Sequence, residues 1–178
     1  MTDVTFFELK NDGDEASVVF LASPEVRYVV PFEGRYLEQE SYLAATSEAP
    51  PVPRLAFNVA LYGSGEVQIL DVFPSSMKSM WDMSTAPGAR VFVIRRQGTT
   101  PDGEPAYLIS LGETLTDEEK TKFGALPVHD LRKVFYDRRV AYEKTVPASV
   151  VEAHRTTPVA GTDPAAWMRT HQPQPPQP

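Results

Sequence analysis

Two runs of alternating apolar and polar residues, separated by a Gly-Ser-Gly turn at residues 63–65, form the strongest pattern in the chain. A period of two places successive side chains on opposite faces of a β-sheet. Glycine permits the positive φ angles that a tight turn needs. The pattern predicts a hairpin of residues 54–62 and 66–73 with an apolar row of Leu55, Phe57, Val59 and Leu61. The opposite row carries Arg54, Asn58 and Tyr62.

Shorter β-type runs precede and follow this hairpin. The further strands are expected at residues 16–21, 25–31, 35–40, 89–96 and 106–111. Clustered prolines predict a loop over residues 42–53, and Met and Trp at helical spacing after Pro74 predict a short helix over residues 74–83. Several strands, a short helix and two more strands are typical of a small closed or partly closed β-barrel with one helix at its end.

The last third of the chain reads as two helices and a tail. Thr116 is expected to cap a helix over residues 115–123, and residues 130–145 form the clearest helix, with Leu131, Val134 and Phe135 on one side. Prolines from Pro147 onward predict a disordered or extended tail. We therefore divide the chain into a barrel (1–111), a C-terminal helical segment (112–146) and a tail (147–178).

Composition narrows the chemistry. The chain of 178 residues has no cysteine and three scattered histidines, so disulfides, thiol catalysis and a metal cluster are not expected, and no cofactor is predicted. No apolar run approaches the ~20 residues of a membrane span, and the N-terminus lacks a secretory pattern. We expect a soluble protein of the cytoplasm.

The net charge of −7 is unevenly distributed. Residues 1–53 contain ten acidic and three basic side chains, whereas the two signs are balanced in the rest of the chain. Binding depends on the local field rather than on the total charge. The distribution therefore permits a basic face and a nucleic-acid partner.

Catalytic patterns are weak. No Gly-rich phosphate loop followed by Lys and Ser or Thr is present, and Ser64 lies in a hairpin turn rather than in a strand-to-helix elbow. We predict that the chain is not an enzyme.

Aromatic residues interleaved with arginines are a different signal, because stacked bases and phosphates require both. Phe57 and Phe92 alternate with apolar residues, and core packing explains them as well as stacking does.

Three segments resemble bacteriophage single-stranded-DNA-binding proteins of the OB-fold, helix-destabilising kind. These are the opening Phe7–Leu21, the hairpin Arg54–Phe73, and Val93–Gly98 followed by Tyr107-Leu-Ile. The resemblance implies a five-stranded antiparallel OB barrel with a short inter-strand helix and a C-terminal helix. Some members carry a Cys-containing zinc loop, which residues 42–53 lack, and many end in an acidic tail, whereas this tail is rich in Pro and Gln.

The implied function is sequence-independent coating of single-stranded DNA in phage DNA replication, recombination or repair, inside the host cytoplasm. Bases would stack on exposed aromatic rings while cations follow the phosphates. The candidate DNA-binding residues are Arg27, Tyr28, Arg35, Tyr36, Arg54, Asn58, Tyr62, Arg90, Arg96 and Tyr107. The alternative is a protein-interaction module that uses the helix of residues 130–145 and the tail to bind a replication or recombination partner or a second copy.

Overall fold

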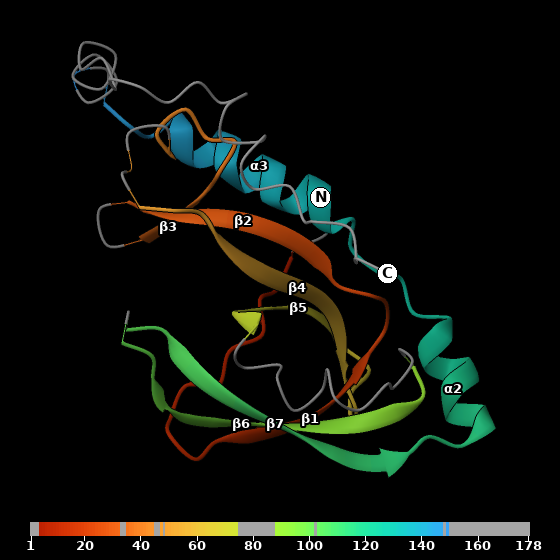
Figure 1. The fold of residues 1–178 in the computed structure, drawn as a ribbon. Coiled ribbons are helices and arrows are strands. Elements are labelled where there is room, and N and C mark those ends of the chain that lie inside the picture. Colours follow the sequence, from red (N-terminus) through yellow and green to blue (C-terminus); the bar gives the residue numbers. More distant parts are fainter. Residues whose placement is uncertain are drawn as a thin grey trace, which may run out of the picture.

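The computed structural model describes residues 4–32, 35–44, 47, 49–74, 88–101, 103–147 and 149. This part of the chain is mainly β with two helices, as predicted, and every strand pair is antiparallel (Figure 1). The strands are β1 (Glu15–Phe20), β2 (Glu25–Phe32), β3 (Arg35–Glu38), β4 (Val52–Leu61), β5 (Val67–Val72), β6 (Arg90–Thr99) and β7 (Pro105–Thr114). The helices are α2 (Asp117–Gly124) and α3 (Leu131–Glu143).

Strand β4 is the centre of the sheet. One edge of β4 pairs with β5 from Leu55 to Ala60. The other edge pairs with β2 over its first half and with β1 over its second half, so β1 and β2 follow one another along the same edge. The predicted loop over residues 42–53 ends too late, because β4 already begins at Val52. Pro53 is tolerated there because β5 pairing starts only at Leu55.

The predicted closed five-stranded barrel is wrong. Seven strands form an open sheet in the order β3-β2-β4-β1-β6-β7, with β5 beside β4. The free edge of β5 pairs with the N-terminal segment instead of with β7. The Phe7 amide donates to the Ile69 carbonyl at 2.8 Å, and the Ile69 amide donates to the Thr5 carbonyl at 2.9 Å. This segment therefore occupies the edge that barrel closure would need.

The predicted hairpin and its apolar row are confirmed. Leu55, Phe57 and Val59 lie in the main core, which is enclosed by β1, β4, β5, β6, β7 and the N-terminal segment. The turn between β4 and β5 contains Gly65 at φ 74°, a left-handed conformation that favours glycine. Phe20 meets Phe57 and Phe92 edge to face at ring-centroid distances of 4.9 and 5.0 Å. The core is thus an aromatic cluster between β4 and the layer of β1 and β6.

The opposite row of β4 is covered by the C-terminal helices. In α3, Leu131 and Phe135 pack on Ala56, and in α2 Phe123 packs in a cluster with Ala60. Between them, the buried Asn58 side chain donates to the His129 carbonyl at 3.0 Å and accepts from its amide at 2.9 Å. The second face of β4 is therefore closed by helices rather than open to a DNA strand.

Both helices begin where the sequence predicts. Thr116 and Glu119 form a reciprocal capping box at the start of α2, and Asp130 caps α3 through the Lys133 amide. No described helix has the length and apolar character needed to cross a membrane. The expected short helix over residues 74–83, and the tail beyond residue 149, lie outside the described residues.

We predict that Asn58→Ala destabilises the fold by about 1–3 kcal/mol, because it leaves the partly buried amide and carbonyl of His129 without partners. Urea unfolding monitored by circular dichroism measures the change. Gln97→Ala is the matched control, since Gln97 lies on β6 away from this helix contact, and it should change the unfolding free energy by less than about 0.5 kcal/mol. Equal effects of the two substitutions would contradict this role of Asn58.

Candidate nucleic-acid interface

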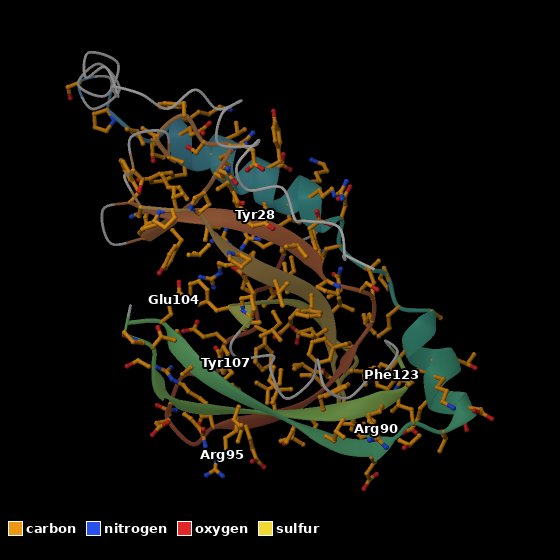
Figure 2. All side chains as sticks on the ribbon, in the orientation of Figure 1. Tyr28, Arg90, Arg95, Glu104, Tyr107 and Phe123 are labelled. Carbon is orange, nitrogen blue, oxygen red and sulfur yellow. The ribbon has the colours of Figure 1, made fainter. Side chains whose placement is uncertain are left out.

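A cleft of about 510 Å³ lies between α3, strands β2 to β5 and the turn that joins β6 to β7. We call it the arginine cleft. Its charged lining consists of five arginines and three carboxylates: Arg27, Arg35, Arg54, Arg138, Arg139, Glu38, Asp71 and Glu104. Its aromatic lining consists of Tyr36, Phe135 and Tyr142. Glu104 marks the side of the cleft that belongs to the β6–β7 turn (Figure 2).

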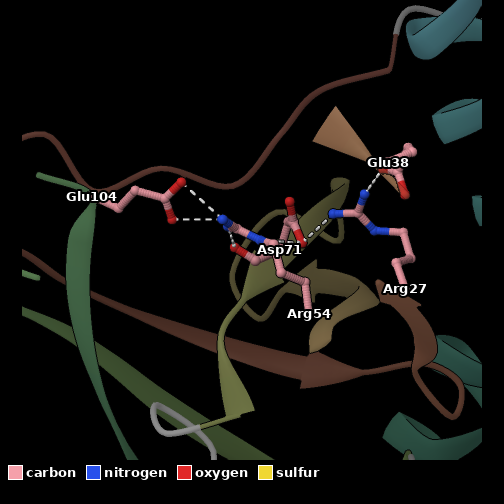
Figure 3. Close-up of polar contacts among 5 residues, drawn as sticks. All are labelled: Arg27, Glu38, Arg54, Asp71 and Glu104. Carbon is pink, nitrogen blue, oxygen red and sulfur yellow. Dashed lines mark hydrogen bonds and ion pairs between the residues drawn. The ribbon is translucent and has the colours of Figure 1, made fainter. Parts of the chain in front are cut away.

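A chain of alternating charges joins five residues that line this cleft (Figure 3). Arg27 pairs with Glu38 and, at 2.7 Å, with Asp71. Asp71 also accepts from Arg54 at 3.2 Å, and Arg54 Nη1 donates to both oxygens of Glu104 at 2.8 and 2.7 Å. Each member comes from a different element, so this ion chain joins β2, β3, β4, β5 and the β6–β7 turn.

The carboxylates of the ion chain favour the charged form of Arg54. Burial alone would lower the pKa of Arg54, but the carboxylates of Asp71 and Glu104 outweigh burial and raise this pKa above its ordinary value. Burial raises the pKa of Glu38, with Arg27 opposing the shift. Arg54 is only 7% exposed and stays charged at every physiological pH.

Three arginines of the cleft have no carboxylate partner among the described residues: Arg35, Arg138 and Arg139. Each instead lies over an aromatic ring. The guanidinium carbon of Arg35 is 4.6 Å from the Tyr142 centroid, that of Arg138 is 4.2 Å from Phe6, and that of Arg139 is 5.0 Å from Tyr136. The guanidinium charges therefore remain available for an anion.

The structure brings four of the ten candidate residues together in the cleft: Arg27, Arg35, Tyr36 and Arg54. Tyr28 is 49% exposed and lines a neighbouring groove on β2. Arg27 and Arg54 are engaged by carboxylates, and Tyr36 contacts Phe73 edge to face at 5.3 Å. Of the four, only Arg35 is an exposed cation that no described carboxylate neutralises.

The other five candidates lie elsewhere and make internal contacts. Asn58 is 3% exposed, and Tyr62 stacks on Phe123 while its hydroxyl donates to Glu119. Arg90 donates to Thr114, near α2 (Figure 2). Arg96 donates to the Leu9 and Lys10 carbonyls, and Tyr107 meets the ring of Phe7. Arg96 and Tyr107 therefore hold the N-terminal segment.

Sequence reasoning missed the wall that α3 contributes. Phe135, Arg138, Arg139 and Tyr142 follow the spacing i, i+3, i+4 and i+7, which places them on one side of a helix. The spacing is visible in the sequence, although charged residues on a helix usually indicate a solvated surface rather than a cleft. Among the described residues no group of three or more His, Cys, Asp or Glu is placed to hold a metal ion. The cleft therefore combines aromatic rings with three guanidinium groups that no described carboxylate neutralises.

We predict that Arg54→Lys lowers the unfolding free energy by about 2–3 kcal/mol. A lysine cannot reproduce the paired contacts to Glu104 together with those to Asp71, so the partly buried Glu104 is incompletely paired and Asp71 depends on Arg27 alone. Chemical denaturation gives the measurement. Arg95→Lys on the exposed side of β6 is the control, and a comparable decrease there would argue against a special role for the ion chain.

We predict that Glu119→Gln reduces the acid sensitivity of the fold. The hydrogen bond from Tyr62, followed by those from Thr116, lowers the pKa of Glu119, so its contribution to stability is present above the unfolded pKa, near 4.5. This contribution disappears as the pH falls through the lowered folded value. Denaturation curves across this pH range should converge for the variant and the wild type at the acid end. Glu118→Gln removes a charge from the same turn and should leave the acid sensitivity in place.

No family model, curated protein or solved structure matches the chain. The resemblance to phage single-stranded-DNA-binding proteins therefore stays a prediction, and the arginine cleft is the observation from which a function can be argued.

Proposed function

We propose that this protein binds single-stranded DNA without sequence preference, and that the arginine cleft accepts part of the strand. In this role it would coat exposed strands during phage DNA replication, recombination or repair in the host cytoplasm. The observation that carries the proposal is the set of three arginines, Arg35, Arg138 and Arg139, that lack carboxylate partners in the described chain yet line one cleft.

Local charge supports this proposal although the whole chain is acidic. The two arginines of the ion chain already neutralise most of the charge of Glu38, Asp71 and Glu104. The remaining arginines give the cleft an excess of positive charge, with five arginines against three carboxylates. Phosphates are attracted by this local field, and the acidic N-terminal third of the chain lowers the overall affinity without removing the site.

Aromatic rings beside these arginines suit the bases. Tyr36 and Tyr142 are partly exposed and line the same cleft, whereas Phe135 is only 6% exposed and packs in the core. A base stacked on an aromatic ring contributes about 1–3 kcal/mol whatever its identity. A volume of about 510 Å³ holds only a short stretch of strand, so further contacts would lie outside the cleft. Neither stacking nor phosphate contacts depend on the identity of the base, so binding through them would show no sequence preference.

A protein-interaction module is the second candidate. The observation in its favour is a group of exposed apolar side chains beside the cleft: Val26, Tyr28 and Tyr136, which are 50, 49 and 57% exposed. A partner or a second copy that covers them would bury apolar area without requiring DNA. Self-association of the protein without any binding of oligonucleotides would support this second candidate function.

We predict that the full chain binds oligo-dT more tightly than a duplex of equal length, with an affinity that falls as salt rises. The double substitution Arg138→Ala/Arg139→Ala should weaken binding by at least about tenfold. It should also reduce the salt slope by roughly 1.4, which is ~0.7 for each phosphate that the variant no longer neutralises. Fluorescence anisotropy over a salt series measures both quantities.

Two controls separate the cleft from general charge. Arg95→Ala/Lys133→Ala removes the same charge outside the cleft, since Lys133 pairs with Asp137 on α3 and Arg95 is exposed on β6. Arg138→Lys/Arg139→Lys keeps the charge and should retain the salt slope. Equal affinity for oligo-dT and duplex, no salt dependence, or equal weakening in the cleft and control variants would each refute the proposal.

A further inference from the structure

A second groove, of about 320 Å³, adjoins the arginine cleft and shares Arg27, Glu38, Phe135 and Arg139 with it. We call it the tyrosine groove. It is lined by β2 and by α3, and the rings of Tyr28 and Tyr136 are 49 and 57% exposed there (Figure 2 shows Tyr28). Val26, 50% exposed, adds apolar surface to the same groove.

We propose that the tyrosine groove binds the Pro-rich C-terminal segment of this same chain, residues 169–178. That segment has the sequence Arg-Thr-His-Gln-Pro-Gln-Pro-Pro-Gln-Pro. Grooves lined by exposed aromatic rings bind Pro-rich segments because the polyproline II conformation loses little entropy on binding. The proposal does not depend on DNA binding.

The prolines recur at a regular spacing along a polyproline II helix. Polyproline II has three residues per turn, so Pro173 and Pro176 share one edge, and Pro175 and Pro178 share a second edge. Prolines of one edge stand ~9 Å apart, at a rise of ~3.1 Å per residue. Two rings that project from neighbouring elements, Tyr28 on β2 and Tyr136 on α3, can each contact a separate proline.

The groove contains three carboxylates and three arginines, so its overall charge is balanced, and only one of its carboxylates offers a specific contact to this occupant. Within the described chain, two acidic residues of the groove, Glu25 and Glu38, are paired with arginines. The third, Glu40, is exposed and has no cationic partner there. Arg169 stands at the start of the Pro-rich segment and supplies the opposite charge.

The chain is long enough to reach. Helix α3 ends at Glu143, and the middle of the groove lies on the order of 10 Å back along this helix. A random-coil chain with as many residues as 150–168 would have a root-mean-square span on the order of 25 Å. Tethering at this length gives the segment an effective concentration near the millimolar range, so a weak contact is sufficient.

The test uses the absence of cysteine from the chain. A nitroxide attached to Gln177→Cys in the full chain, labelled uniformly with ¹⁵N, should weaken the amide signals of Val26, Tyr28, Arg132 and Tyr136 several-fold. The signals of Leu108 and Ser110 on β7 should keep their intensity. Uniform weakening over the surface, or no weakening at all, would overturn the proposal.

Three variants and one mixture complete the experiment. Replacing the four prolines at 173, 175, 176 and 178 by alanine, or introducing Tyr136→Ala, should restore the signal intensity. Tyr42→Ala removes another exposed tyrosine, which lies outside the groove, and should restore nothing. In a mixture of two proteins, one carrying the nitroxide but no ¹⁵N and the other carrying ¹⁵N but no nitroxide, the amide signals should keep their full intensity. Equal weakening in the mixture would assign the groove to the tail of a second copy and overturn an intramolecular contact.

Discussion

The ion chain of Glu38, Arg27, Asp71, Arg54 and Glu104 is the constraint on which the site depends. Five elements that are separated in sequence each contribute one residue to it. The ion chain therefore forms only when β2, β3, β4, β5 and the β6–β7 turn are all in place. Its two arginines are largely removed from solvent, and burying them without carboxylates would be strongly unfavourable. The same requirement assigns Arg27 and Arg54 a structural role and leaves Arg35, Arg138 and Arg139 as the cleft cations that are available to a ligand.

Burial of both faces of β4 explains why its polar residues serve the fold. A strand between a core and two helices has no solvated face, so each polar group on it needs an internal partner. Arg54 finds carboxylates and Asn58 finds the backbone of His129. Tyr62, at the end of the row, finds Glu119 in α2. Alternation therefore distinguishes the two faces of the strand correctly, whereas it does not reveal that helices cover the second face.

The sequence predicted features that depend on neighbouring residues, but not features that depend on long-range contacts. Local signals were sufficient for the hairpin, for the Leu55–Phe57–Val59 core row, for the Thr116 cap and for the helix that begins after Asp130. Open or closed topology was not predictable, because it depends on the long-range pairing of residues 5–7 with Ile69. The cleft combines β2, β3 and α3 across about a hundred residues, so no single window contains it. Only the i, i+3, i+4, i+7 spacing after Phe135 gave a local sign of it.

Helix α3 links the two candidate surfaces. The arginine cleft and the tyrosine groove share Arg27, Glu38, Phe135 and Arg139, so a shift of α3 changes both at once. In the described chain, Leu131 and Phe135 bury the apolar side of this helix, Glu143 accepts from Ser41 at 2.7 Å, and Arg132 pairs with Glu25 at 2.8 Å. The last pair is partly exposed and contributes little, whereas the Asn58 contacts anchor the segment that leads into α3. The position of α3, and with it the shape of both surfaces, therefore depends more on buried packing and on Asn58 than on the charges that the surfaces display.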